Sequence, residues 1–146
     1  MRYITGGVPW SEEKIRYFVD RQVSLYTERG FCRWRVLDPA TGDLMGFCGV
    51  GIWGNYLEPE IGWWLAQRYW GRGFATEAAR CALRDIFERG VLERVISVAR
   101  VGNRASRRVM EKIGLRLACE FENEGVELVR YEILHAEYSR RPRFDV

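Results

Sequence analysis

E-I-G-W-W-L-A, from Glu60 to Ala66, opens the stretch of sequence that decides the fold. Its first residues form a short apolar segment, which predicts a strand. After a loop that contains glycine, apolar residues recur at spacings of three and four, which predicts a helix with one wide apolar face. This face comprises Phe74, Ala75, Ala78, Ala79, Ala82, Leu83, Ile86 and Phe87. Gly90 predicts the end of the helix, and the β-branched run Val95–Val101 predicts a buried parallel strand.

The loop between the first strand and the helix has the form R-x-x-G-x-G, from Arg68 to Gly73. Gly71 and Gly73 have no Cβ, so their backbone can approach a ligand closely and adopt positive φ. The first N–H groups of the following helix have no partner within it, and the helix dipole favours an anion there. The loop therefore predicts a diphosphate site or, in the alternative, only a tight turn. A nucleoside triphosphate does not fit the pattern, because no G-K-[ST] follows the glycines.

A second glycine pattern, G-x-G-x-x-G at Gly49, Gly51 and Gly54, is not interpreted as a dinucleotide site. Such a site requires a helix directly after the glycines, whereas the residues that lead up to Pro59 are typical of a turn. The pattern overlaps Leu44–Trp53, which is itself a predicted strand. We therefore expect these glycines to ease the bending of that strand.

The composition is that of one globular domain over residues 1–146, with 47% hydrophobic and 29% charged residues. No apolar run approaches the roughly 20 residues of a membrane span, and the N-terminus lacks a signal-peptide pattern, which predicts a cytoplasmic protein. The net charge of +3 is too small to indicate nucleic-acid binding by itself. The cysteines have no C-x-x-C spacing and a single histidine to join them, so we expect reduced thiols packed as small hydrophobic residues and no metal site. They are Cys32, Cys48, Cys81 and Cys119.

Two further helices and two hairpins are predicted around this central unit. Ser11 can cap a helix before the first hairpin. The core-facing stripe of this helix comprises Ile15, Phe18, Val19, Val23 and Tyr26. Phe31–Leu37 and Leu44–Trp53 flank a strong turn signal and predict an antiparallel hairpin. Ala105–Ile113 predicts a short helix with Met110 inward, and a second antiparallel hairpin follows it.

Residues 60–115 resemble the core of the GNAT superfamily of N-acetyltransferases, most closely the RimJ/RimL-like branch that acetylates the N-termini of ribosomal proteins. P-E-I-G-W-W-L-A and Y-W-G-R-G-F-A-T-E-A resemble that branch's strand and pyrophosphate loop, and N-R-A-S-R-R-V-M-E-K-I-G-L resembles its cofactor-side helix. The resemblance extends over most of the chain at lower specificity. It implies a three-layer α+β fold: a mixed, mostly antiparallel sheet with a parallel strand pair splayed around the cofactor, and helices on both faces. It also implies acetyl-coenzyme A as the donor and a primary amine as the acceptor.

The resemblance places cofactor binding at the end of the first strand and at the start of the helix. The pantetheine arm is expected along the backbone of Trp64, Leu65 and Ala66, where an N–H also stabilises the oxyanion. The diphosphate is expected at the loop and the helix start, which comprise Arg68, Gly71, Arg72, Gly73, Phe74, Ala75 and Thr76. Asn103 has two interpretations: a helix N-cap, or a hydrogen-bond partner of the pantetheine amide or of a water molecule.

Glu60 is the candidate general base, acting directly or through water, because it matches the acid of the family's P-E-I-G segment. Glu58 lies on the same face of the strand by the two-residue period. The alternative is that Glu60 only balances the charge of an arginine. The family's usual general acid, a tyrosine, corresponds here to Met110, which cannot donate a proton. Ser106 is the candidate that delivers a proton through a relay and also borders the cofactor, and its alternative role is a helix-capping hydroxyl.

The acceptor is predicted from the cost of removing a proton from it. At pH 7 an α-amine with a pKa near ~8 costs about 1 kcal/mol to deprotonate, and a lysine about 4.6 kcal/mol. A site with one candidate carboxylate base suits the easier amine, so we expect a protein N-terminus or a small amine of low pKa, acetylated by direct attack in a ternary complex. Two other interpretations stay open: a non-catalytic acyl-coenzyme-A-binding module, and an RNA-binding protein that uses its Arg-rich tail.

Members of the family normally carry a strand and a helix before the helix at Ser11, and these are missing here. The first strand normally covers one edge of the sheet, and an uncovered edge invites pairing with another chain. Either the recorded sequence starts late, or a partner subunit covers the edge in a homodimer.

Overall fold

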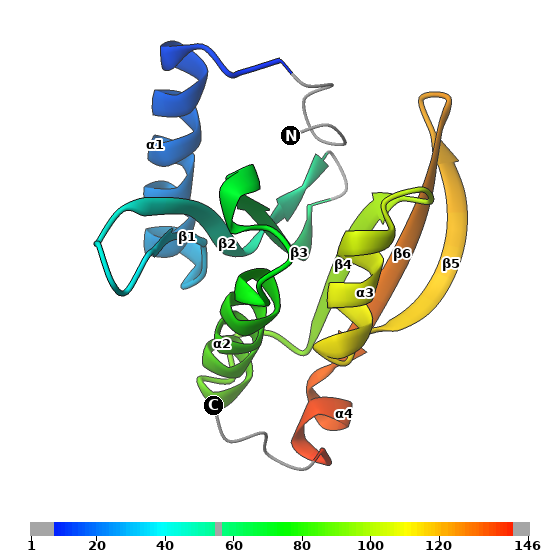
Figure 1. Cartoon of the computed structure of the whole chain (residues 1–146). Coiled ribbons are helices and arrows are strands. Elements are labelled where there is room, and N and C mark those ends of the chain that lie inside the picture. The colour runs from blue at the N-terminus through cyan, green and yellow to red at the C-terminus, as the bar shows by residue number, and fades with distance from the viewer. Residues whose placement is uncertain (1–7, 55–56, 142–146) are drawn as a thin grey trace.

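The computed structural model describes residues 8–54 and 57–141 of the chain, and its centre is one six-stranded sheet (Figure 1). The strand order is β1-β2-β3-β4-β6-β5. The strands are β1 (Arg33–Leu37), β2 (Leu44–Trp53), β3 (Glu58–Leu65), β4 (Arg94–Arg100), β5 (Arg116–Asn123) and β6 (Val126–Leu134). Every neighbouring pair is antiparallel except β3 and β4, which run parallel.

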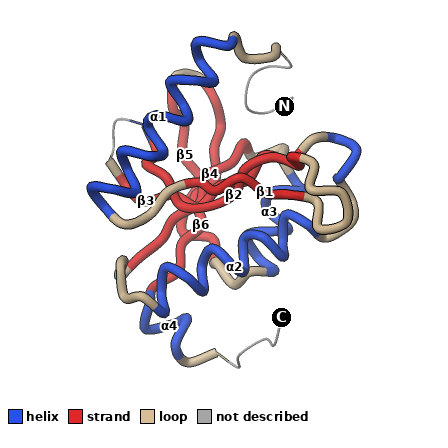
Figure 2. Tube along the Cα trace, turned by 90° about the vertical axis from the view of Figure 1, so that its left-hand side faces the viewer, coloured by secondary structure: helices blue, strands red, loops and turns tan. Residues whose placement is uncertain are grey.

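Helices cover both faces of this sheet, with α1 on one side and α2 and α4 on the other (Figure 2). The helices are α1 (Glu12–Arg29), α2 (Phe74–Glu88), α3 (Arg104–Lys112) and α4 (His135–Ser139), and η2 (Gln67–Tyr69) is a short 3-10 turn. The predicted fold class, a mixed sheet with one parallel pair and helices on both faces, is confirmed. In the described part of the chain, no helix has the length and apolarity that crossing a membrane would require.

The helix α2 forms as its apolar spacing predicts. Its residues Ala79, Leu83, Ile86 and Phe87 are buried, and they join a core that includes the sheet residue Ile61. Burial of the larger side chains, Leu83, Ile86 and Phe87, stabilises the fold by about 1.5–3 kcal/mol each. The helix therefore fixes the position of its own N-terminus relative to β3, which matters because the glycine loop lies between them.

The parallel strands β3 and β4 are joined at one point only. Their single register pair is Glu60 opposite Ile96, whereas β2 and β3 share a continuous register over the whole of β3. Beside this pair, the buried Ser97 hydroxyl donates a hydrogen bond of 2.9 Å to the Ile61 carbonyl oxygen. Within the described strands no register pair follows toward Leu65, so the sheet parts at the C-terminal ends of β3 and β4.

The predicted N-cap of α1 is confirmed, since the Ser11 hydroxyl accepts a hydrogen bond of 3.2 Å from the Lys14 N–H. The predicted core-facing stripe is mostly wrong. Leu25 is the residue of α1 that is buried, whereas the side chains of Val23 and Tyr26 are 63% and 44% exposed. Ile15 and Val19 are exposed too, and only Phe18 of the stripe packs inward, against Phe47 and Trp64. The spacing identified an apolar face, but no described element packs over the outer part of α1.

Several boundaries differ from those predicted. The strand β3 begins at Glu58, so the turn predicted through Pro59 is wrong there, while residues 55–56 lie outside the described ranges. Both hairpins, β1–β2 and β5–β6, are confirmed, and α3 lies one residue earlier than predicted. The short helix α4 was not predicted. The expectation of packed cysteines holds for Cys32 and Cys48 and is wrong for Cys81 and Cys119, which are exposed.

Candidate functional site

The glycine loop leads from β3 into α2 in an open conformation. Gly71 has φ of +70° and Gly73 has φ of +80°, a region that residues with a Cβ rarely adopt. A Cβ at either glycine would meet no atom within 4 Å, so space lies in front of both. The glycines are therefore required by the backbone conformation of the loop, and the space beside them is free for a ligand.

The N-terminus of α2 presents unused hydrogen-bond donors to this space. The Glu77 N–H donates to the Gly73 carbonyl oxygen at 3.0 Å, and this is the first bond of the helix. The N–H groups of Phe74, Ala75 and Thr76 precede it, and no described side chain caps this end. These donors and the positive end of the helix dipole form a site for an anion.

Two arginines flank the loop. The Arg68 guanidinium lies 4.8 Å from the centre of the Tyr69 ring, and the Arg72 guanidinium lies 4.9 Å from the centre of the Phe74 ring. Contacts of this kind hold a cation over an aromatic face without neutralising its charge. The loop thus combines backbone donors with two positive side chains, which is a suitable environment for a diphosphate.

The end of β3 offers one free backbone donor toward the gap in the sheet. The Ala66 N–H is engaged, because it donates to the Met45 carbonyl oxygen at 2.8 Å. N–H groups alternate between the two sides of a strand, so the Trp64 N–H faces β2 and the Leu65 N–H faces the side on which β4 has parted. The Leu65 carbonyl oxygen accepts a hydrogen bond of 2.8 Å from the Trp70 indole. Leu65 is therefore the residue of the predicted segment whose N–H is available to a pantetheine arm or an oxyanion.

Glu60 lies at the point where the sheet is still closed, and its side chain is buried against Arg33. The shortest distance between the guanidinium and the carboxylate is 2.8 Å, and both side chains are 10% exposed. Burial raises the pKa of the Glu60 carboxyl from its ordinary value of 4.5 to about 7, and the Arg33 charge and hydrogen bond oppose part of this rise. Sequence reasoning anticipated an arginine partner in general but missed Arg33, because the two residues are 27 positions apart. Only the register of β1, β2 and β3 brings them to one face.

Glu58, the second carboxylate on this face, is held by two arginines. Arg130 of β6 approaches it to 2.6 Å and Arg94 of β4 to 3.4 Å. These contacts connect β3 to β4 and β6, the strands on the other side of the gap. Glu58 is therefore more firmly engaged than Glu60, whose bond to Arg33 involves only the oxygen Oε1.

On the opposite face, α3 carries the remaining predicted residues. The Asn103 Oδ1 accepts a hydrogen bond of 3.2 Å from the Ser106 N–H, which is the N-cap arrangement. Its amide nitrogen is not used in this bond. Met110 is 1% exposed and belongs to the core, so it packs as an apolar residue. The Glu60 carboxylate lies on the α1 face of the sheet, which Phe47 of β2 shares, so Ser106 and Glu60 belong to opposite faces.

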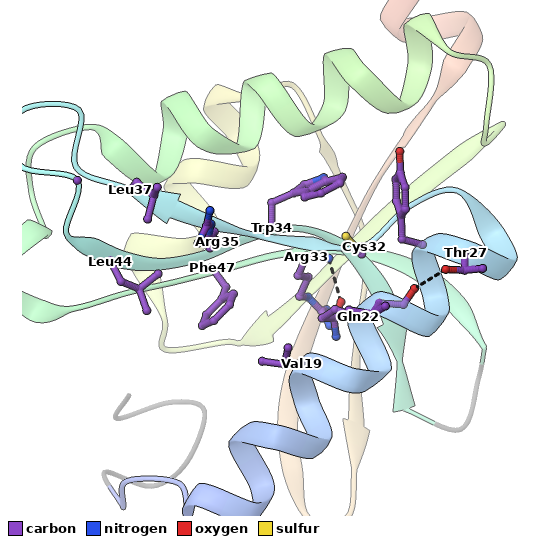
Figure 3. A pocket seen from close by; sticks show the side chains of 13 residues that line it. Val19, Gln22, Thr27, Cys32, Arg33, Trp34, Arg35, Leu37, Leu44 and Phe47 are labelled. Atoms are coloured by element: carbon purple, nitrogen blue, oxygen red, sulfur yellow. Dashed lines mark hydrogen bonds between the residues drawn. The ribbon is translucent and has the colours of Figure 1, made fainter.

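A separate cavity of about 610 Å³ lies between α1 and the β1–β2 hairpin (Figure 3). Its lining includes Val19, Val23 and Tyr26 of α1 and Leu37 and Leu44 of the hairpin. It lies at the β1 edge of the sheet and not at the gap between β3 and β4. Among the described residues, no group of three or more His, Cys, Asp or Glu side chains could hold a metal ion.

The Acetyltransferase (GNAT) domain model matches residues 1–116 of this sequence. The chain belongs to the GNAT acetyltransferase family. The family predicted from residues 60–115 is thereby confirmed. YnaD, an uncharacterized N-acetyltransferase of Bacillus subtilis (strain 168), is 31% identical over 145 residues, which cover 95% of this chain and 82% of YnaD.

Two further relatives from Bacillus subtilis (strain 168) match over shorter ranges. The uncharacterized protein YkkB is 34% identical over 105 residues, which cover 70% of this chain and 61% of YkkB. The putative ribosomal N-acetyltransferase YdaF is 46% identical over 55 residues, which cover 38% of this chain and 30% of YdaF. The chain thus spans less than two thirds of the length of these two relatives.

Solved structures of GNAT proteins share the fold. An acetyltransferase of the GNAT family from Bacillus anthracis superimposes with a TM-score of 0.76 at 31% identity, over 94% of this chain and 82% of that one. The RimL ribosomal L7/L12 alpha-N-protein acetyltransferase, solved in complex with coenzyme A, superimposes with a TM-score of 0.71 over 86% of this chain and 73% of that one. Its identity of 21% supports the fold alone.

The raised pKa of Glu60 predicts how the stability of this GNAT protein depends on pH. Between pH 4.5 and about 7 the folded protein keeps a proton that the unfolded chain has released. The resulting stability is fully present below pH 4.5 and is lost as the pH rises through about 7. We expect the melting temperature of the wild type to fall relative to that of Glu60→Gln as the pH rises across this window, because the glutamine cannot ionise.

The control is Glu13→Gln, which removes an exposed carboxylate from the first turn of α1. Its melting curve should follow that of the wild type with a constant difference from pH 4.5 to pH 8. A constant difference for Glu60→Gln as well would show that the Glu60 carboxyl titrates as it does in the unfolded chain.

Proposed function

We propose that this protein is an acetyl-coenzyme-A-dependent N-acetyltransferase, an acyltransferase of the EC 2.3.1 type, that acts on a primary amine. The observation that carries the proposal is the uncapped N-terminus of α2 behind the glycine loop, next to the free Leu65 N–H where β3 and β4 part. A helix end suits a diphosphate, and an unpaired strand edge suits the amide groups of a pantetheine arm. Family membership supports the same donor. The free thiols of the described cysteines suit a cytoplasmic location.

The donor would be held along the gap in the sheet. Its diphosphate accepts hydrogen bonds from the N–H groups between Gly71 and Thr76, with Arg68 and Arg72 balancing the charge. Its pantetheine arm pairs with the backbone at Leu65, and the Asn103 amide nitrogen is a further donor for it. The thioester is thereby presented next to the one closed register pair, which is where Glu60 lies.

The amine nitrogen would attack the thioester carbonyl carbon in a ternary complex. The C–N bond forms while the carbonyl oxygen becomes an oxyanion, which accepts a hydrogen bond from the Leu65 N–H. The intermediate then collapses, the C–S bond breaks, and the coenzyme A thiolate leaves. The amine proton passes to Glu60, directly or through water, and the thiolate takes a proton from a relay at Ser106 or from solvent. The products are the N-acetyl amide and coenzyme A.

The acceptor we propose is an α-amine at a protein N-terminus or a small amine of low pKa. The cost of about 1 kcal/mol for deprotonating an α-amine at pH 7 is within reach of a single carboxylate base. The similarity of 55 residues to a putative ribosomal N-acetyltransferase supports the N-terminal choice. A non-catalytic acyl-coenzyme-A-binding module is the alternative, and the buried Met110 in the position of the family's acid favours it.

We further propose that the β1 edge of the sheet is covered by a second copy of the chain. The edge strand β1, the cavity beside it and the exposed face of α1 form one largely apolar surface, which polar side chains such as Gln22 and Arg35 interrupt. An uncovered edge strand of this kind pairs readily with another chain. We expect sedimentation to give twice the mass of 17.1 kDa, and Val23→Asp, which charges this surface, to give the monomer. A wild-type monomer at millimolar concentration would contradict the homodimer.

We predict that acetyl-coenzyme A raises the melting temperature, because a ligand that binds only the folded state stabilises it by about 2.7 kcal/mol at 100 times its Kd. Gly73→Glu should abolish the shift, since it places a negative charge where the diphosphate must lie. Gly125→Glu is a matched control: Gly125 has φ of +77°, close to the +80° of Gly73, and equally open surroundings, but it lies in the β5–β6 turn. A shift that persists in Gly73→Glu would show that the loop is only a turn.

We predict that Glu60→Gln lowers turnover by roughly 10²–10⁴-fold, the range typical of general base catalysis, with little change in acetyl-coenzyme A affinity. Raising the pH should recover part of the loss, because the amine then deprotonates in solution. Release of coenzyme A thiol with a panel of peptides and small amines measures both. Wild-type turnover in the variant across pH 6–9 would remove Glu60 from the mechanism. Absence of turnover in the wild type with every amine, together with a thermal shift, would favour the binding module.

A further inference from the structure

We propose that Arg33 is a positioning residue for the reaction: it holds the Glu60 carboxylate in place and keeps it charged, through a path that glycines of β2 and β3 leave open. This inference rests on the proposed function, because it assumes that Glu60 accepts the amine proton. Arg33 lies on β1 and Glu60 on β3, so the arginine side chain crosses the intervening strand β2 to reach its partner. The crossing occurs on the α1 face of the sheet.

The glycines make this crossing sterically feasible. Gly51 lies opposite Glu60 on β2, and a Cβ at Gly51 would overlap the Arg33 guanidinium. A Cβ at Gly62 would lie 3.2 Å from Glu60 Oε1 and 3.4 Å from Arg33 Nη2, tighter than ordinary contact. Gly51 is one of the glycines of the G-x-G-x-x-G pattern that were expected to ease bending, and here it clears the space that the guanidinium fills.

Packing holds Arg33 in this position from both ends of its side chain. Its guanidinium lies 5.0 Å from the centre of the Trp64 ring. Its backbone N–H donates a hydrogen bond of 2.9 Å to the side-chain oxygen of Gln22, which reaches over from α1 (Figure 3). Within the described residues the buried Arg33 Nε has no hydrogen-bond partner. The guanidinium is therefore fixed by its surroundings, and Glu60 is the anion that satisfies it.

The charges around Glu60 make Arg33 its dominant electrostatic partner. Glu58 shares the α1 face, but its charge is balanced by Arg94 of β4 and Arg130 of β6. The neighbours of Glu60 on β2 and β4 are Gly51 and Ile96, which carry no charge, and Gln22 of α1 is neutral too. Burial alone would keep Glu60 protonated in the neutral range, and Arg33 opposes that effect.

The geometry of the pair leaves one carboxylate oxygen for chemistry. Arg33 Nη2 binds Oε1 at 2.8 Å, and within the described part of the chain Oε2 accepts no hydrogen bond. A bidentate contact would occupy both oxygens and lower the basicity further. The single contact instead keeps the carboxylate oriented, partly ionised near neutral pH and able to accept a proton at Oε2.

The test is the pH profile of kcat/KM in Arg33→Gln and Arg33→Lys. Loss of an opposite charge at this distance should move the acidic limb upward by about one to three pH units in Arg33→Gln. Turnover at pH 6.5 should then fall about tenfold or more, with partial recovery at pH 9 and an unchanged KM for acetyl-coenzyme A. Arg33→Lys keeps the charge and should return the limb toward the wild-type position. A uniform loss at all pH values would show that Arg33 is merely structural and would overturn the proposal.

Two further variants separate positioning from folding. Arg33→Gln in the Glu60→Gln background leaves no unpaired buried charge, and it should lower kcat no further than Glu60→Gln alone, because Arg33 acts through Glu60. Gly51→Ala leaves Arg33 intact but obstructs its guanidinium, so its acidic limb should move upward as in Arg33→Gln. An additional tenfold loss in the double variant would contradict the proposal.

A measurement without turnover keeps this inference distinct from the proposed function. In Arg33→Gln the pH window in which Glu60 changes stability should extend upward by at least one unit beyond that of the wild type. If Glu60→Gln keeps full turnover but the pH window of stability moves in Arg33→Gln, Glu60 is not the base, and the coupling between Arg33 and Glu60 still holds. If the window does not move, Arg33 does not govern the charge of Glu60 and the proposal fails.

Discussion

The parting of β3 and β4 is the constraint on which the rest of the structure depends. Two parallel strands that share one register pair leave backbone groups on both edges without the partners that a continuous sheet would supply. The chain passes from the open end of β3 through η2 and the glycine loop into α2, so the free strand edge and the free helix end lie at the same opening. One break in the ladder thereby supplies both kinds of backbone donor, and the buried face of α2 keeps them in a fixed relation.

Glu60 occupies the last closed position before this break. Its backbone is paired with β2 on one side and with β4 on the other, and its side chain is held by Arg33. A carboxylate at such a point has little freedom to move. Beyond it, toward Leu65, β3 and β4 are no longer paired and the sheet opens. The site thus places a rigidly held acid–base group next to the open gap in which a flexible ligand would bind. Accurate placement of reacting groups requires such an arrangement.

The sequence predicts those parts of the fold that depend on local spacing. The apolar period of Phe74–Phe87 identifies α2, and alternation with turn residues identifies both hairpins, because these signals are complete within one element. It identifies α1 as a helix, but it fails for the core-facing stripe of that helix, because no described element packs over most of the stripe. It fails for α4, whose five residues are too few to show a period.

The candidate site is divided in the same way. The glycine loop and the helix start are contiguous in sequence, so their geometry could be predicted from Arg68–Thr76 alone. The pair of Arg33 and Glu60 could not, since it depends on the register of three strands and on glycines that a pattern search assigns to another use. Likewise, only the observed ladder distinguishes the engaged Ala66 N–H from the free one at Leu65.

The two edges of the sheet differ in how well they resist uncontrolled association. The edge strand β5 is irregular between Leu117 and Cys119 and carries charged, solvent-exposed side chains such as Arg116 and Glu120, which are features that discourage stray pairing. The opposite edge, β1, has the apolar surface of α1 beside it. Solubility of the isolated polypeptide is therefore governed by one end of the sheet, and charged substitutions intended to improve its handling belong there and not on the β5 side.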